Sequence, residues 1–164
     1  MPSDWTLLKE ELGSGGYGKV VRARRNTDGK EAAAKIVSKR RMKLSAIQKE
    51  VQLMEMLSHP NIIAMYAAEE VSDNYYIYME LATGGELFGK VIASGALSED
   101  EARPHFVELM SAVQYMHSMG VVHRDLKLVC WHANHLRHCG IALVTRDELT
   151  STLSFSLCAG ECPS

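Results

Sequence analysis

The chain has no long apolar stretch and no excess of charge of either sign. Its 164 residues contain 18 lysines and arginines against 20 aspartates and glutamates, a formal net charge of −2. A nucleic-acid-binding domain would show a strong basic excess, so we expect no nucleic-acid partner. No segment approaches the roughly 20 apolar residues that span a bilayer, and the N-terminus lacks a basic segment followed by an apolar one. We therefore expect an intracellular protein of the cytoplasm or nucleus without a membrane contact.

Cysteine is absent from the first 129 residues, and all four cysteines lie in the last 35. Without an export signal, a disulfide framework is not expected. Three of the seven histidines crowd into the same segment, and cysteine with histidine can ligate zinc, although these spacings match no standard zinc finger. The composition changes near Leu128, so we treat residues 128–164 as a divergent tail. The residues concerned are Cys130, Cys139, Cys158, Cys162, His132, His135 and His138.

The first eighty residues have the pattern of short strands interrupted by one helix. Asp28-Gly29 lies between apolar stretches and predicts a β-hairpin turn. Ser45 and Gln48 fit a capping box that begins a helix, which should end at His59-Pro60. Residues 62–66 and 75–81 are predicted as further strands.

From residue 84 onward the apolar period is helical. Residues 84–93 predict a short helix, and Ser98 with Glu101 forms a second capping box. The helix that follows should run through Ala102, Phe106, Leu109, Val113 and Met116 and end at Gly120. Strands followed by helices indicate an α+β fold.

A glycine-rich segment, Gly13–Val20, lies between two predicted strands. Glycines at this spacing allow a backbone to approach phosphate oxygens. A dinucleotide-binding turn would lead into a helix, whereas β-type residues follow here. A Walker A loop would need serine or threonine where Val20 stands. A glycine-rich hairpin without a ligand remains the simpler alternative.

A lysine stands inside an otherwise apolar strand, in Ala32-Ala33-Ala34-Lys35-Ile36. A desolvated lone charge is expensive, so Lys35 should have a partner. Glu50, on the predicted helix, is the candidate. The alternative for each residue is that its charged end reaches the surface.

The segment Val122-His123-Arg124-Asp125-Leu126-Lys127, taken with these features, resembles a eukaryotic protein kinase domain. Lys127, two residues after Asp125, makes the segment resemble the serine/threonine branch of the family. The segment Gly84–Phe88 resembles the calcium/calmodulin-dependent and checkpoint-type kinases. The resemblance covers residues 5–127. It implies a small lobe of antiparallel sheet plus one helix over residues 5–81, a hinge to about residue 83, and the helical start of the large lobe over residues 84–127.

The resemblance implies that ATP is bound under the glycine loop. Lys35 would hold the α- and β-phosphates while it pairs with Glu50. The implied covering residues are Gly13, Gly15, Gly18 and Val20. The implied residues around adenine are Leu12, Ala33, the gatekeeper Met79, and the backbone of Glu80 and Ala82.

The resemblance also implies phosphoryl transfer to a serine or threonine of a protein. Glu86 would lie near the ribose or meet a basic residue of the substrate. Asp125 would accept the substrate hydroxyl proton, and Lys127 would stabilise the transferred group. The implied partners are a protein substrate or a regulatory protein.

The family's Mg²⁺ is expected, but its ligands are not evident. Cys130 stands where the family has a metal-binding asparagine, and no Asp-Phe-Gly occurs. The nearest match is His138-Cys139-Gly140. We therefore assign no metal ligand and keep two alternatives: a catalytically inactive kinase-like binding or scaffold module, and a truncated product without a function of its own.

A basic run, Ser38-Lys39-Arg40-Arg41-Met42-Lys43, precedes the first predicted helix. It could serve nuclear import or nucleic-acid binding. We favour the other interpretation, a solvated connector between strand and helix.

Overall fold

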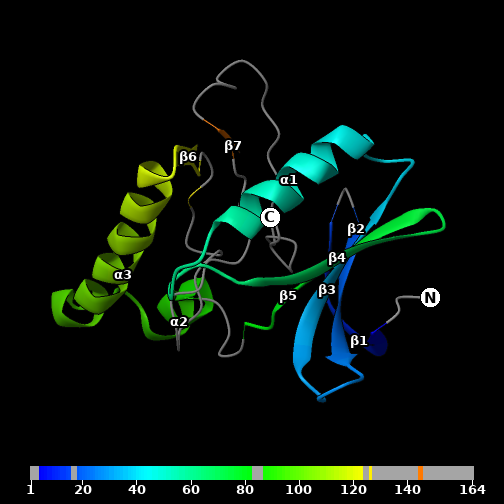
Figure 1. Ribbon diagram of the computed structural model, residues 1–164. Coiled ribbons are helices and arrows are strands. Elements are labelled where there is room, and N and C mark those ends of the chain that lie inside the picture. Colours follow the sequence, from blue (N-terminus) through cyan, green and yellow to red (C-terminus); the bar gives the residue numbers. More distant parts are fainter. Residues whose placement is uncertain (1–3, 16–17, 83–86, 124–125, 127–143, 146–164) are drawn as a thin grey trace. The chain divides into compact units, whose positions relative to one another are not determined.

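A computed structural model gives the fold, and it describes residues 4–15, 18–82, 87–123, 126 and 144–145 (Figure 1). The chain divides into two compact units, which are treated separately below. Of the described residues, the first unit contains those up to Met56 together with Ala64–Leu81, and the second contains Leu57–Ile63 and those from Ala82 to Thr145. Within the described residues, no helix has the length and apolar character needed to cross a membrane.

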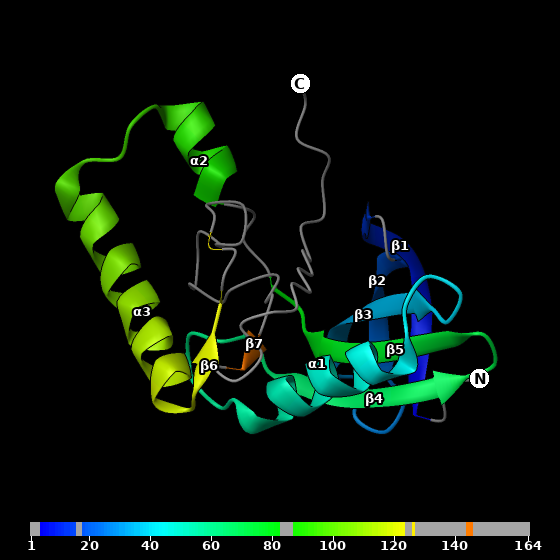
Figure 2. The ribbon, with the colours of Figure 1, turned by 90° about the horizontal axis from the view of Figure 1, so that it is seen from above.

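The first unit is a five-stranded antiparallel sheet with one helix. The strand order is β1-β2-β3-β5-β4, and α1 lies beside β4 and β5 (Figure 2). This arrangement confirms the expected α+β fold with a kinase-like small lobe. The elements are β1 (Trp5–Gly15), β2 (Gly18–Arg25), β3 (Glu31–Ser38), α1 (Leu44–Met56), β4 (Met65–Val71) and β5 (Asn74–Glu80).

The pairing register assigns neighbouring residues of β3 to opposite faces of the sheet. Lys35 pairs with Val20 of β2 and with Ile77 of β5. Ala34, one position earlier, pairs with Val21 and Tyr78. Because side chains alternate along a strand, Lys35 and Ala34 belong to different faces. The face that carries Lys35 is the one that meets α1.

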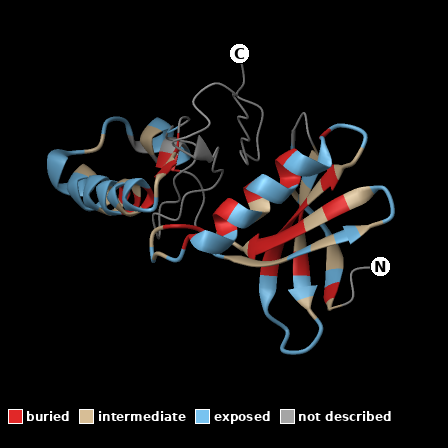
Figure 3. Cartoon of the chain, turned by 45° about the horizontal axis from the view of Figure 1, so that its top comes forward, coloured by how far each residue is buried: buried red, intermediate tan, exposed pale blue. Residues whose placement is uncertain are grey.

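The opposite face carries an apolar cluster built around an aromatic stack. The Trp5 ring lies 4.8 Å from the Tyr78 ring and 6.1 Å from the Tyr66 ring. Trp5 is on β1 and Tyr78 on β5, and the strands between them contribute Ala23 and Ala32, both fully buried. Figure 3 shows buried residues on several strands of this sheet. Small side chains at these two positions leave room for the indole. Burial raises the pKa of the Tyr78 phenol, because the phenolate would be poorly solvated there.

The turn between β2 and β3 forms where Asp28-Gly29 predicts it. Gly29 has φ +74°, a left-handed conformation that glycine adopts without strain. Its N–H donates to the Arg25 carbonyl at 2.9 Å. The Arg25 guanidinium donates to the Asp28 carboxylate, Nε to Oδ1, at 2.9 Å and lowers the pKa of Asp28 to about 2.

Helix α1 begins differently from the prediction. The Lys43 carbonyl accepts N–H groups from Ala46 and Ile47 at 3.0 and 3.4 Å, so Lys43 is the N-cap residue. Ser45 is already helical, and the predicted capping box of Ser45 and Gln48 is wrong. The helix also ends at Met56, before the predicted stop at His59-Pro60.

Strand β4 is also displaced from its predicted position. It covers Met65–Val71 rather than residues 62–66. From Ala67 to Val71 the residues alternate between partly buried and exposed, as expected at a sheet edge with one covered face. The apolar pair Ile62 and Ile63 is buried in the connection before the strand.

The second unit contains α2 (Leu87–Ser94), α3 (Glu99–Ser118), and the short antiparallel pair β6 (Val121–Val122) and β7 (Val144–Thr145). The capping box at the start of α3 is confirmed. Ser98 Oγ accepts the Glu101 N–H at 3.4 Å, and the Glu101 carboxylate accepts the Ser98 N–H at 3.0 Å. Helix α3 ends before Gly120, whose φ of +74° also agrees with the prediction.

Helix α3 packs in this unit through Leu109, Ala112 and Met116, which are all buried. Phe106, which follows the same apolar spacing, is 57% exposed. The segment before β4 contacts α3 through His59, which stacks on Tyr115 at 5.1 Å between ring centroids.

The two serines predicted as caps should differ in their effect on stability. We expect Ser98→Ala to lower the free energy of unfolding by about 1 kcal/mol, because a backbone N–H at the start of α3 loses its acceptor. Ser45→Ala should be neutral or slightly stabilising, since Ser45 is inside α1 and alanine has the higher helix propensity. Urea unfolding of both variants measures this. Equal losses at the two positions would contradict the observed start of α1.

Candidate functional site

A buried ion pair joins β3 to α1. Lys35 Nζ lies 2.7 Å from Glu50 Oε1, and the two side chains are only 7% and 6% exposed. The contact predicted from the sequence is therefore present. The second carboxylate oxygen of Glu50 is buried and has no hydrogen-bond partner among the described residues. At this burial, removal of either partner would be strongly destabilising.

Apolar side chains lie next to Lys35 on the same face of the sheet. Val20 pairs directly with Lys35, and Ala33 pairs with Met79 two residues along. Ala33 and Met79 are buried, while Val20 is partly exposed. Leu12, near the end of β1, is also partly exposed and precedes Gly13, the register partner of Val20. The face thus presents a cation beside a small apolar surface.

The glycine-rich segment is a hairpin between β1 and β2. Gly13 pairs with Val20, and Gly15 pairs with Gly18 across the tip. A Cβ atom at Gly18 would lie 1.9 Å from the carbonyl oxygen of Ile36 on β3. Glycine is therefore required at position 18 by the close packing of two strands. From the sequence, Gly18 was expected only to let the backbone approach phosphate oxygens. The spacing of the glycines contains no information on the contact between Gly18 and β3.

The backbone N–H of Glu80 is bound by the residue just before β4. Its N–H donates to the Ala64 carbonyl at 2.8 Å, and its carboxylate accepts the Ala64 N–H at 3.4 Å. The N–H of Glu80 is thus engaged by the protein, and a ligand would have to use another group. Ala82 follows outside any helix or strand and belongs to the second unit.

Several predicted site residues lie outside the described part of the chain. These are Glu86, Asp125 and Lys127, together with all four cysteines and the histidines of the tail. In residues 4–15, 18–82, 87–123, 126 and 144–145, no group of three or more His, Cys, Asp or Glu could hold a metal ion. His123, which belongs to the predicted catalytic segment, is buried.

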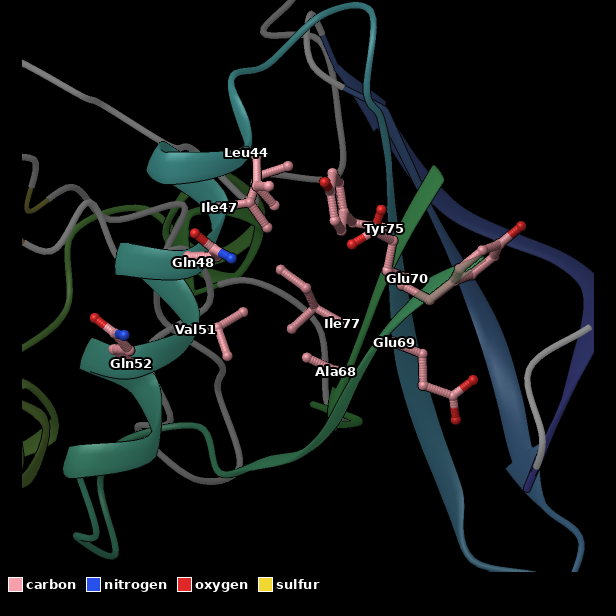
Figure 4. A pocket seen from close by; sticks show the side chains of 11 residues that line it. Leu44, Ile47, Gln48, Val51, Gln52, Ala68, Glu69, Glu70, Tyr75 and Ile77 are labelled. Atoms are coloured by element: carbon pink, nitrogen blue, oxygen red, sulfur yellow. The ribbon is translucent and has the colours of Figure 1, made fainter. Parts of the chain in front are cut away.

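A groove of about 350 Å³ separates α1 from β4 and β5 (Figure 4). Leu44, Ile47 and Val51 of α1 lie opposite Ala68 and Ile77. Lysine and arginine are absent from its lining residues, and Glu69 and Glu70 are among them. A groove that lacks cations and contains carboxylates does not suit a triphosphate, so we place the candidate site at Lys35 instead.

Comparison with known proteins decides the family. Residues 7–130 match the family described as "Protein kinase domain". The chain belongs to the protein kinase family. It is a eukaryotic serine/threonine kinase domain of the calcium-dependent or checkpoint-like type, as its relatives show.

Two curated kinases and one solved structure illustrate the similarity. Calcium-dependent protein kinase 5 of Plasmodium berghei is 40% identical over 124 residues, which cover 75% of this chain and 22% of that protein. Serine/threonine-protein kinase SIK1 of Rattus norvegicus is 43% identical over 123 residues, covering 73% of this chain and 16% of that kinase. The crystal structure of Rad53 1-466 in complex with AMP-PNP matches with a TM-score of 0.72 and 36% identity, over 76% of this chain and 34% of that chain. This kinase chain thus spans a small part of the length of each.

Gly18 offers a direct test of the hairpin packing in this kinase domain. We expect Gly18→Ala to destabilise the domain by about 1–3 kcal/mol, because the added methyl group meets the β3 backbone. Gly89→Ala is the matched control. Gly89 lies in α2, and a methyl group added there would have no neighbouring atom within 4 Å, so alanine should stabilise that helix by about 0.5–1 kcal/mol. Thermal unfolding measures both, and a stabilising Gly18→Ala would refute the close contact.

Proposed function

We propose that this kinase domain binds ATP, with Lys35 as the cation that contacts the α- and β-phosphates. The buried pair of Lys35 and Glu50 carries the proposal. A lysine held at 2.7 Å from a buried carboxylate has a fixed position, and a fixed charge in a poorly solvated site binds phosphate oxygens more strongly than one in water. Gly13 of the glycine hairpin pairs with Val20, and Val20 pairs with Lys35. The backbone of the hairpin therefore lies near Lys35.

The apolar surface beside Lys35 supports the position of the adenine. An alanine at position 33 leaves space over the strand, and its register partner Met79 is almost fully buried. A planar base would bury apolar area against Val20, Ala33 and Leu12. Because the Glu80 N–H is bound to Ala64, we assign the adenine hydrogen bonds to the remaining backbone groups of Glu80 and Ala82. That Rad53 was solved with AMP-PNP agrees with a nucleotide site in this family.

We propose further that the reaction is transfer of the γ-phosphoryl group of ATP to a serine or threonine of a protein. Asp125 would take the hydroxyl proton and Lys127 would stabilise the transferred group, with Glu86 near the ribose or a basic substrate residue. Mg²⁺ would supply charge neutralisation at the phosphates when bound. The proposed partners are a protein substrate and its regulators, and the proposed location is the cytoplasm or nucleus.

A catalytically silent module that binds ATP or a partner is the second candidate. Cys130 stands at the position of the family's metal-binding asparagine, and the sequence contains no Asp-Phe-Gly. Loss of one preorganised electrostatic group costs about 2.7–4 kcal/mol, or roughly 10²–10³ in rate. Two such losses would reduce a typical kinase turnover of about 1–100 s⁻¹ to a very low level.

Lys35 is tested by nucleotide binding. We expect Lys35→Met to raise the Kd for ATP at least about tenfold, because the phosphates lose a cation worth more than about 1.4 kcal/mol. The single variant also leaves Glu50 buried without a partner, which destabilises the fold. The double variant Lys35→Met/Glu50→Met removes both charges and should retain the fold while it still fails to bind. Calorimetric titration of each gives the Kd, and a double variant that is folded and binds ATP normally would exclude the proposed site.

The reaction is tested separately with radiolabelled ATP and a mixture of serine- and threonine-containing peptides. If the domain is an active kinase, Asp125→Asn should lower the incorporated label by about 10²-fold or more, because the hydroxyl proton has no acceptor. ATP binding should persist, since Asp125 is proposed to act on the substrate hydroxyl. Equal label from both proteins, at unchanged ATP affinity, would favour the silent module.

A further inference from the structure

Apolar side chains surround Lys35 on its face of the sheet. Its register partners are Val20 and Ile77, and Ala33 and Val37 lie two positions away along β3 on the same face. These four side chains contain no oxygen atom. A phosphate group at this position would therefore meet the Lys35 ammonium and backbone N–H groups, all of which are hydrogen-bond donors.

Glu50, the acidic residue in contact with Lys35, is not open to a metal ion. Its Oε1 lies 2.7 Å from Lys35 Nζ, and the side chain is only 6% exposed. Its Oε2 is buried as well. Because Mg²⁺ dehydrates reluctantly and usually keeps several waters in protein sites, the hydrated ion cannot reach this carboxylate. Glu50 therefore remains the partner of Lys35 and does not become a metal ligand.

The two positions at which the family holds Mg²⁺ carry different chemistry in this sequence. In kinases the ligands are an asparagine and the aspartate of Asp-Phe-Gly, and both supply oxygen. Here Cys130 stands at the asparagine position, and the nearest match to the second motif is His138-Cys139-Gly140. Thiol and imidazole groups suit zinc and copper, whereas Mg²⁺ is held by oxygen ligands. The residues present therefore do not fit the family's Mg²⁺.

We propose, on the basis of the ATP site under Proposed function, that Lys35 binds the free nucleotide and that Mg²⁺ weakens this binding. Mg²⁺ bridges β- and γ-phosphate oxygens and cancels part of the negative charge that attracts the Lys35 ammonium. A site with oxygen ligands regains this loss through its own contacts with the ion. Here neither Glu50 nor the residues at the two family positions make such a contact, so the loss is not recovered.

This preference has a consequence for the role of the chain. The occupancy of the site would follow the concentration of free ATP rather than that of the Mg²⁺ complex. Free ATP also lacks the ion that neutralises charge during phosphoryl transfer. The preferred ligand would therefore be bound without being turned over, which agrees with the catalytically silent module.

Calorimetric titration of the full chain with ATP tests the proposal, once in EDTA and once in excess MgCl₂. Sodium chloride added to the EDTA sample matches the ionic strength, because salt alone weakens interactions between exposed charges. The Kd should be at least about fivefold lower in EDTA, which is the effect of roughly one unit charge near contact distance in water.

A second ligand and two variants locate the effect. Adenosine has no phosphate, so its Kd should be the same with and without Mg²⁺. The double variant Lys35→Met/Glu50→Met should fail to bind ATP in either solution, because the cation that attracts the phosphates is absent. Ser98→Ala changes the cap of α3 and no residue of the site, and should retain the Kd ratio of the unaltered chain.

The outcomes separate this proposal from the ATP site on which it rests. An equal or lower Kd in MgCl₂ would overturn the preference for free ATP and leave the ATP site intact. The absence of ATP binding in both solutions would refute the site itself, and the preference with it. An equal Mg²⁺ effect on adenosine would also overturn the proposal, because the effect would then not act through the phosphates.

Discussion

The candidate site depends on one interaction, the buried contact between the Lys35 ammonium and the Glu50 carboxylate. The two charged groups are 2.7 Å apart and their side chains are only 6–7% exposed, so water cannot take the place of either partner. Such a pair contributes little net stability when compared with two apolar residues, but either partner alone would be strongly destabilising. The pair therefore constrains α1 against β3 at a defined position. Any phosphate-binding role of Lys35 depends on this constraint, since an unconstrained lysine would lose side-chain entropy on binding.

The sheet can accommodate this pair because its two faces carry different kinds of side chain. One face carries Lys35, Ala33 and Val20, while the other carries the aromatic stack of Trp5 and Tyr78 over small alanines. The stack packs β1 and β5 together on the apolar side of the sheet. The face towards α1 is then available for a charge and a small apolar surface. The close approach of Gly18 to Ile36 shows how tightly β2 and β3 are joined beside it.

The predictions that succeeded rested on local chemistry. Asp28-Gly29 and Ser98 with Glu101 each contain, within four residues, the groups that make the turn or the cap, so no distant contact is needed. The Ser45 prediction used the same rule and failed, because the N-cap of α1 is Lys43, two residues earlier. The strand predicted over residues 62–66 failed for a related reason. Ile62 and Ile63 are apolar because they are buried in a connection, and hydrophobicity does not distinguish a buried connection from a strand.

The order of the glycine loop, the strand lysine, the helix glutamate and the His-Arg-Asp segment was sufficient to identify the family, because each motif is a short run of residues with its own chemistry. The same residues could not show that Lys35 and Glu50 approach to 2.7 Å, that position 18 lies against the Ile36 carbonyl, or that Phe106 points outward from α3. Those facts depend on which surfaces of separate elements meet. Helical periodicity reveals that a helix has an apolar stripe, but only the packed neighbours decide which of its apolar residues are covered.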